Sequence, residues 1–276
     1  FPRVLLSIIV GASLSVSGAA MQGLLKNPLA DGSTLGVSSG ATLGAVIVIA
    51  TGINIPVVHQ LGITVVSIVF AFISLIIILS LSYKIDYNLS NNTIILTGVI
   101  FSMFISSAVS LLVALSKKEL SQIIFWLMGS FSGRGWEHLY LLFPFFVIGT
   151  SGLFIHGRDL DAFALGEEQA QYIGVDTKKV KLRILIYTSV LIGASVSVCG
   201  SIAFVGLVIP HITRMLIGPK HGKLLIFSSL IGAIFMMLTD LISRTIMKPL
   251  ELPIGVVTSF IGSIVFVYIF YTQRKK

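Results

Sequence analysis

Long apolar runs separated by short breaker segments are the feature that most restricts how this chain can fold. Nine such runs lie roughly at residues 3–25, 35–52, 61–82, 92–115, 138–156, 183–200, 202–217, 223–245 and 254–272. An apolar run of about 20 residues is long enough to cross the hydrocarbon core of a bilayer as an α-helix. The pattern therefore predicts an all-α, polytopic transmembrane helical bundle.

Composition supports this class and removes several others. Charged residues make up 11% of the chain, whereas a soluble domain carries about a quarter. The net charge of +8 is typical of basic cytoplasmic loops in a membrane protein, so we expect no nucleic-acid partner. The only cysteine, Cys199, lies in an apolar run and excludes both an intrachain disulfide and a cysteine-based metal cluster.

The distribution of basic residues predicts the orientation in the membrane. With the C-terminus inside, 13 of the 19 Lys and Arg residues fall on the cytoplasmic side, as the positive-inside rule requires. The other six fall outside; they are Arg3, Lys117, Lys118, Arg134, Arg244 and Lys248. An odd number of runs then places Phe1 outside, and we expect the chain to begin within a longer natural protein.

The ionisable residues point to transport without chemistry on this chain. Asp240 is the one carboxylate inside an apolar run, and Arg244 follows at the i+4 spacing of a helical ion pair. No phosphate-binding loop of the G-x-x-x-x-G-K-[ST] type is present. The five histidines have no metal-ligand spacing; they are His59, His138, His156, His211 and His221. We therefore predict a transport subunit that is not itself an enzyme.

The polar stretch 159–182 interrupts the apolar runs on the cytoplasmic side. Asp161 is predicted to cap a short helix, and Glu167 and Glu168 are predicted to occupy the first turn of a second one. Gly174 is placed to end that helix, and Asp176 to cap the next. Such a helix–turn–helix knob suits insertion into a partner, whereas the alternative is a solvated loop.

Small and hydroxyl residues repeat on two of the predicted helices. Gly36, Gly40 and Gly44 lie on one face of the 35–52 helix, which favours a close contact with another helix. Ser102 shares one face of the 92–115 helix with Ser106 and Ser110. These hydroxyls either bond to carbonyls of their own helix or line a pathway for a large polar solute.

Several motifs in order along the chain carry a family resemblance. They are residues 17–23 (SGAAMQG), 27–30 (NPLA), 35–41 (LGVSSGA), 126–130 (WLMGS), 164–176 (ALGEEQAQYIGVD), 200–214 (GSIAFVGLVIPHITR) and 251–255 (ELPIG). In this the chain resembles the permease subunits of ABC importers for iron-siderophores, haem and cobalamin. The resemblance implies one type II importer permease domain over residues 1–276 with coupling helices at about 159–182. It also implies ten helices, of which the first would be missing here.

The resemblance also implies roles for individual residues. Contacts with an ATPase are expected from Leu165, Gly166, Glu167 and Gln171. Docking of an extracytoplasmic binding protein is expected at Arg3 and Arg244, where local ion pairing or anchoring in head groups is the alternative. The expected wall of the translocation pathway is Ser102, Met103, Ser106 and Ser110.

These expectations define an assembly in the plasma (inner) membrane of a prokaryote. The chain would pair with a second permease copy or a paralogue, two ATPase subunits and a substrate-binding protein. We expect no cofactor on this chain, because ATP and Mg²⁺ would bind to the ATPase. A ferric siderophore is the first substrate expected, with haem and cobalamin open. Two other classes remain: an ion-coupled secondary transporter, and a passive channel or scaffold without a tight partner at 159–182.

Overall fold

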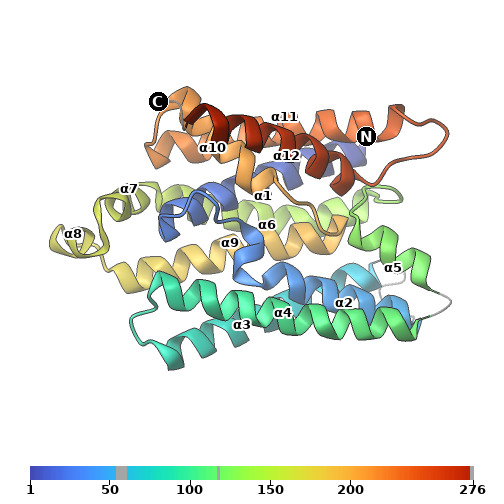
Figure 1. Cartoon of the computed structure of the whole chain (residues 1–276), viewed down its shortest axis with the longest axis horizontal. Helices are drawn as coiled ribbons and strands as arrows, with labels where there is room; N and C mark the ends of the chain where they lie inside the picture. The colour runs from blue at the N-terminus through green and yellow to red at the C-terminus, as the bar shows by residue number, and fades with distance from the viewer. Residues whose placement is uncertain (54–60, 117–118, 274–276) are drawn as a thin grey trace.

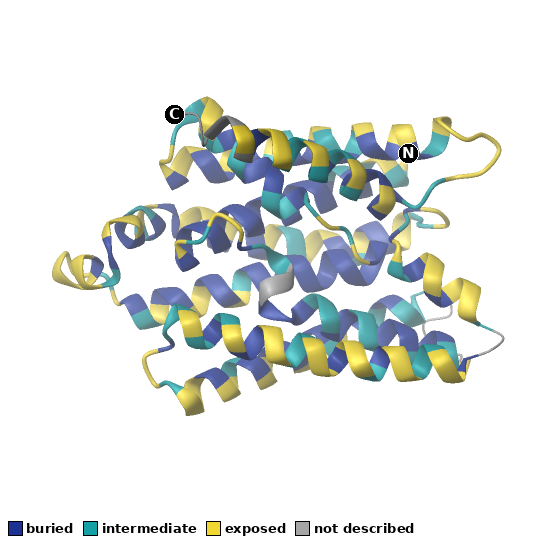
Figure 2. Cartoon of the chain, in the orientation of Figure 1, coloured by how far each residue is buried: buried dark blue, intermediate teal, exposed yellow. Residues whose placement is uncertain are grey.

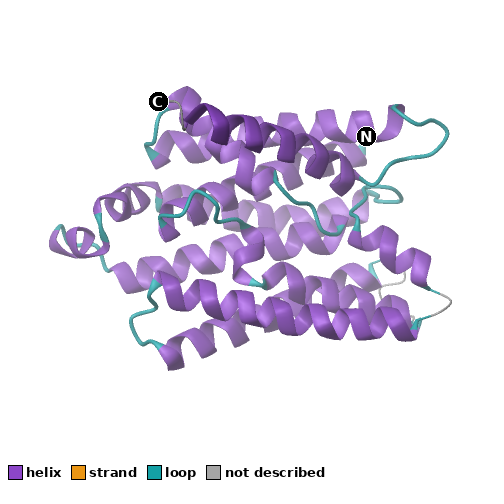
Figure 3. Cartoon of the chain, viewed as in Figure 1, coloured by secondary structure: helices purple, strands orange, loops and turns teal. Residues whose placement is uncertain are grey.

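The computed structural model describes residues 1–53, 61–116 and 119–273, and within these ranges the chain is helical and has no strands (Figure 3). The elements are α1 (Pro2–Leu25), the short 3₁₀ helix η1 (Gly32–Leu35), α2 (Val37–Thr51), α3 (Gly62–Ile85), α4 (Asn91–Leu115), α5 (Leu120–Leu127), α6 (Trp136–Ile155), α7 (Gly157–Leu165), α8 (Glu167–Tyr172), α9 (Thr177–Cys199), α10 (Val205–Ile217), α11 (His221–Thr245) and α12 (Ile254–Gln273). The breaker predicted at 54–56, His59, Lys117, Lys118 and the basic residues 274–276 lie outside the described residues.

Each of the nine apolar runs contains an apolar helix, so the predicted all-α membrane bundle is confirmed. Six of these helices are long and apolar enough to cross a membrane, while α2, α10 and α12 present shorter apolar stretches. The prediction for 202–217 was wrong at its start, because residues 200–204 are not helical and α10 begins at Val205. The predicted cap of the next helix is confirmed, since Asp176 caps α9, which begins at Thr177 ahead of the apolar run that starts near residue 183.

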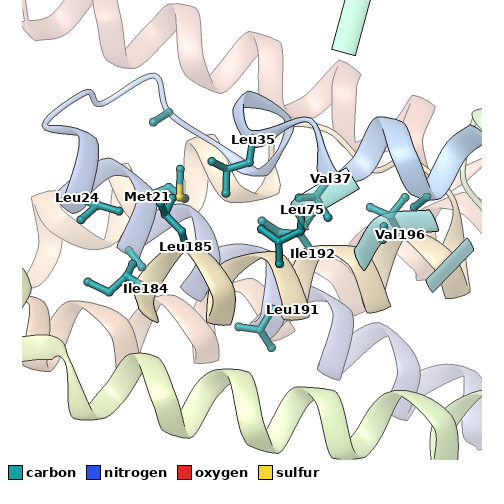
Figure 4. Packing of buried hydrophobic residues seen from close by; sticks show 14 of the residues in the cluster. Met21, Leu24, Leu35, Val37, Leu75, Ile184, Leu185, Leu191, Ile192 and Val196 are labelled. Atoms are coloured by element: carbon teal, nitrogen blue, oxygen red, sulfur yellow. The ribbon is translucent and has the colours of Figure 1, made fainter. Parts of the chain in front are cut away.

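Helices α1 and α9 lie at the centre of the bundle. In their most apolar 18-residue windows, 83% and 78% of the residues are buried, against 17% for α4, which lies at the edge (Figure 2). Met21 and Leu24 of α1 meet Ile184 and Leu185 of α9 in the core (Figure 4). The outer helices therefore present apolar side chains to lipid or to other subunits, which is the arrangement expected of a membrane protein.

Glycines allow the close helix contacts that hold this bundle together. A Cβ atom added to Gly18 of α1 would overlap the backbone of Gly206 on α10. The predicted glycine face is confirmed for Gly40 and Gly44, because a Cβ on Gly40 would overlap the Ser74 side chain of α3 and one on Gly44 would lie 2.9 Å from Phe70. Gly36 was wrongly included, because it precedes α2 as a left-handed N-cap. In a lipid environment, where burial of apolar surface gives little drive to helix association, such backbone approach is a main source of packing energy.

The two ends of the bundle differ in character. Helices α7 and α8 protrude beyond the transmembrane helices at one end, near the turn between α3 and α4 (Figure 1). The N-terminus, α5 and the loop between α11 and α12 lie at the opposite end (Figure 1). Basic residues Arg158, Lys178 and Lys179 belong to the first end, so the positive-inside rule makes it the cytoplasmic end.

Candidate coupling, docking and translocation surfaces

Residues 157–176, called the polar knob below, form a folded unit at the cytoplasmic end. Helix α7 ends at Gly166, whose φ of 141° and ψ of 150° make a sharp turn into α8. This backbone conformation is essentially restricted to glycine. Glu167 and Glu168 lie in the first turn of α8, as predicted, where the helix dipole favours negative charge.

The end of α8 also follows the predicted design. Gly174 has a φ of 91°, and its N–H donates to the Gln171 carbonyl while Val175 N–H donates to the Ala170 carbonyl at 3.0 Å. The Asp176 carboxylate then accepts the Lys179 N–H at 3.1 Å and caps α9. Hydrogen bonds and charge from Lys179 hold the pKa of Asp176 below its ordinary value. The knob is therefore an ordered helix–turn–helix unit and not a loose loop.

The prediction that Asp161 caps a short helix was wrong. Asp161 lies inside α7, and its carboxylate instead accepts the backbone N–H of His221 at 2.7 Å and contacts its Nδ1 at 2.8 Å. His221 is the first residue of α11, so Asp161 satisfies a free N–H at the start of a distant helix. The competing partner was invisible in the sequence because it lies 60 positions away.

A fully buried lysine attaches the knob to the transmembrane helices. The Lys181 ammonium of α9 donates to Glu167 Oε1 and to the Leu89 carbonyl, both at 2.8 Å. Gln171 donates to the Thr177 hydroxyl at 2.9 Å. Two of the predicted ATPase contacts, Glu167 and Gln171, therefore hold the knob onto its own chain through these bonds.

The exposed surface of the knob includes three large apolar side chains among polar ones. Leu165, predicted as a partner contact, is 70% exposed, and Tyr172 and Ile173 are 89% and 64% exposed. Sequence reasoning missed Tyr172 and Ile173, although apolar residues at the end of a polar helix are a usable signal for a contact surface. These three side chains, called the knob tip below, are the part of this end best suited to contact another protein.

At the opposite end, Arg3 and Arg244 lie together with two carboxylates. Arg3 contacts Asp240 at 2.8 Å and Glu251 at 2.9 Å, and Arg244 contacts Asp240 at 3.1 Å. The ion pair predicted between Asp240 and Arg244 is confirmed. Asp240 is buried, whereas Glu251 is well exposed. This outer ion cluster ties α1, α11 and the loop before α12 together, and its four charges balance.

The predicted pathway residues of α4 divide between two faces. Met103 is 66% exposed, and Ser106 and Ser110 are also exposed. Ser102 is partly buried, and a Cβ atom on Gly36 would lie 3.1 Å from its hydroxyl, so it faces the N-cap of α2. The Ser110 hydroxyl donates to the Ser106 carbonyl at 2.9 Å. This is the first of the two predicted alternatives, in which the hydroxyls bond to carbonyls of their own helix.

A second surface with hydroxyl and aromatic side chains lies near the outer end. A cavity of about 610 Å³ opens between α5, the segment before α10, and α12. Serines and two phenylalanines lie on its wall; they are Ser201, Ser259, Ser263, Phe204 and Phe260. Sequence reasoning missed this set, because the serines are isolated in apolar runs and only folding brings them together.

Three chain segments meet beside this cavity at glycines. Gly255 N–H donates to the Met128 carbonyl at 3.1 Å, and Ile254 N–H to the Gly129 carbonyl at 3.0 Å. A Cβ on Gly129 would lie 2.6 Å from the Ser201 carbonyl oxygen, and one on Gly200 would overlap the Trp126 carbonyl. The turn after α5, the segment before α10 and the start of α12 are therefore joined through backbone contacts.

Comparison with known proteins shows which family the sequence and the fold resemble. The sequence model of the FecCD transport family matches residues 1–272. The chain is 48% identical to the uncharacterized ABC transporter permease protein YvrB of Bacillus subtilis over 99% of this chain and 78% of YvrB. It is 37% identical to the hemin transport system permease protein HmuU of Yersinia pestis, over 100% of this chain and 82% of HmuU.

A solved structure of a metal-chelate type ABC transporter in an inward-facing conformation has the same fold. The TM-score is 0.90 and the identity 34%, over 98% of this chain and 85% of the other. The family match covers nearly the whole sequence, and the fold agrees with it throughout. This chain therefore belongs to the FecCD transport family and is a multi-pass permease subunit of an ABC importer in the prokaryotic inner membrane.

Proposed function

We propose that this chain imports a metal chelate, with a ferric chelate as the first candidate, using ATP hydrolysed by a separate subunit. A second permease copy or paralogue would complete the pore, two ATPase subunits would bind at the polar knob, and a binding protein would dock outside. ATP and Mg²⁺ would be held by the ATPase, and this chain would carry no cofactor. The exposed apolar knob tip on an ordered cytoplasmic unit is the observation that carries the proposal.

The attachment of the knob gives a route for coupling. Lys181 joins α8 to α9 and to the turn after α3, and Asp161 joins α7 to the start of α11. Movement of an ATPase surface that contacts Leu165 and Tyr172 would therefore reach two transmembrane helices through these hydrogen bonds, of which the one from Lys181 to the Leu89 carbonyl is buried. These hydrogen bonds involve charged groups and are therefore stronger than bonds between neutral partners.

The walls near the pore suit a large chelate better than a bare ion. The exposed face of α4 and the outer cavity offer serine hydroxyls and aromatic rings. No group of three His, Cys, Asp or Glu side chains able to hold a metal ion occurs among the described residues. HmuU is named for hemin, and the solved relative for metal chelates. Haem and cobalamin remain alternatives to a ferric siderophore within this class.

Co-purification tests the central contact of this proposal. The permease would be expressed with its ATPase subunit and isolated through a tag on the permease. Leu165→Ala with Tyr172→Ala should strongly reduce the ATPase recovered, because exposed anchors of this kind carry much of an interface's binding energy. Leu250→Ala is the matched control, since Leu250 is 69% exposed at the opposite end. Full ATPase recovery with the double variant would refute the proposed contact.

A further inference from the structure

A groove at the cytoplasmic membrane surface lies apart from the surfaces described above. It encloses about 530 Å³ between the end of α3, the following turn and the start of α9. Its lining residues are Leu79, Ser80, Tyr83, Tyr87, Leu89, Lys178, Lys179 and Leu182. Neither the coupling surface nor the translocation pathway uses these side chains.

The polar end of the groove holds a lysine with aromatic neighbours. The half-buried Lys178 ammonium lies 3.0 Å from the ring centroid of Tyr87 and 4.7 Å from that of Tyr83. Lys179 pairs with Asp176 and Lys181 with Glu167, but no carboxylate of the described residues pairs with Lys178. Because Lys178 also lies at the positive end of the α9 dipole, an anion at this position would be favoured.

The groove becomes apolar toward the membrane interior. Leu79 lies one turn deeper than Tyr83 on α3, and Leu182 one turn deeper than Lys178 on α9. Exposed apolar side chains continue along the same faces at Ile76 and Ile186. The groove therefore offers a cation and tyrosines at the level of the head groups, followed by a wall that suits an acyl chain.

The walls of the groove are fixed before any ligand arrives. The buried Lys181 ammonium holds the Leu89 carbonyl, and the Asp86 carboxylate accepts the backbone N–H groups of Asn88 and Ser90, both at 2.9 Å. The turn that carries Tyr87 is thus tied both to α9 and to itself. A preformed wall lowers the ordering cost of binding.

We propose that this groove binds an anionic phospholipid of the cytoplasmic leaflet, with the phosphate at Lys178 and one acyl chain along Leu79 and Leu182. The lipid would occupy a defined position between α3 and α9, beside the turn that Lys181 joins to the polar knob. A phospholipid fits better than a free anion, because most of the surface that lines the groove is apolar. A lipid there would stiffen the contact between α3 and α9.

Native mass spectrometry of the purified full chain tests this site with phosphatidylglycerol and phosphatidylcholine of identical acyl chains. The unmodified protein should retain phosphatidylglycerol preferentially, and Lys178→Gln should weaken that retention about fivefold. Lys84→Gln is the matched control, since Lys84 is exposed on α3 but does not line the groove. It should change retention by less than about twofold, because exposed charges are screened.

Two further measurements separate a lipid from a simple anion. Leu182→Glu should weaken retention of phosphatidylglycerol as well, because it places a negative charge on the wall proposed for the acyl chain. Inorganic phosphate in large excess should leave the lipid bound. Displacement by phosphate would overturn the lipid assignment. Equal retention of both lipids by the unmodified protein, or equal losses with Lys178→Gln and Lys84→Gln, would overturn the site itself.

Discussion

The buried charged residues of this protein link helices to one another through ion pairs and hydrogen bonds. Lys181 is fully buried, yet it satisfies its charge with Glu167 and a backbone carbonyl. Asp240 is equally buried and lies between Arg3 and Arg244. Removing one partner from such a group leaves the others unsatisfied, which costs more than the interaction itself contributes.

Replacing Lys181 tests whether these buried charged contacts stabilise the fold. Lys181→Met should lower the free energy of unfolding by about 1–3 kcal/mol, because the Leu89 carbonyl loses its donor in a buried place. Lys179→Met removes an exposed ion pair with Asp176 and should cost less than about 1 kcal/mol. Thermal unfolding of the two variants in the same detergent gives the comparison. Equal stabilities would contradict a fastening role for Lys181.

Asp86 predicts a distinct dependence of stability on pH. Hydrogen bonds from Ser90 and Asn88 lower the pKa of Asp86 from 3.8 to about 2. The depressed pKa means that its contribution is complete above about pH 4 and disappears as the pH falls to about 2. Asp86→Ala should therefore be less stable than the unmodified protein at pH 5 and nearly equal to it at pH 2. A gap in melting temperature that does not shrink in acid would contradict this assignment.

The outer ion cluster makes a prediction for docking. Glu251 is the exposed carboxylate on Arg3. If the binding protein docks at Arg3 as predicted, one of its carboxylates would replace Glu251. Glu251→Gln should strengthen capture of the binding protein at low salt, and Arg244→Gln should weaken it, each by up to about fivefold. Glu137→Gln removes an exposed charge on α6 as the control. Unchanged capture with both variants, measured by surface plasmon resonance, would place docking elsewhere.

At the scale of helices, glycine spacing determines which elements can touch. The α2 glycines were predicted as a contact face, and α3 packs on that face. Similar approaches join α1 to α10 at Gly18 and Gly206, and the outer segments at Gly129 and Gly200. These last contacts could not be predicted, because a glycine outside a repeat does not reveal which distant backbone it meets.

Substitutions on α2 and α3 test the contact directly. Gly40→Ala should lower the free energy of unfolding by about 1–3 kcal/mol, because its Cβ would overlap Ser74 and approach the Phe70 carbonyl at 2.8 Å. Gly62→Ala is the control, since nothing lies within 4 Å of the Cβ at that position. Ser74→Gly should restore part of the loss in Gly40→Ala. A neutral Gly40→Ala would show that the two helices can separate without cost.

At the scale of the whole molecule, the sequence was sufficient for the class and for the location of the polar knob, while the membrane orientation stays a prediction from the positive-inside rule. Apolar runs and capping residues are local signals, each visible in one stretch of chain, and the charge bias is a simple count along the sequence. The role of Glu167 as a partner of Lys181, of Asp161 as a cap for α11, and of Ser259 and Ser263 as neighbours of Ser201 depends on contacts between distant segments. Such contacts come from packing and leave no local pattern.

The assembled transporter would convert closure of ATPase subunits into motion of α9 and α11 around a pathway shared by two permeases. The polar knob and the outer ion cluster lie at opposite ends of the helical bundle (Figure 1). Energy would therefore enter at the cytoplasmic end and substrate at the other. An ion-coupled transporter would instead require no contact at the knob tip and would respond to an ion gradient.

Uptake by proteoliposomes tests this account most directly. The permease would be reconstituted with its ATPase and binding protein, and accumulation of a radiolabelled ferric chelate measured with ATP or with an imposed proton or sodium gradient. The account predicts accumulation only with hydrolysable ATP and the binding protein, and its loss with Leu165→Ala and Tyr172→Ala while Leu250→Ala remains active. Accumulation driven by an ion gradient without ATP, or full activity of the knob-tip variant, would contradict it.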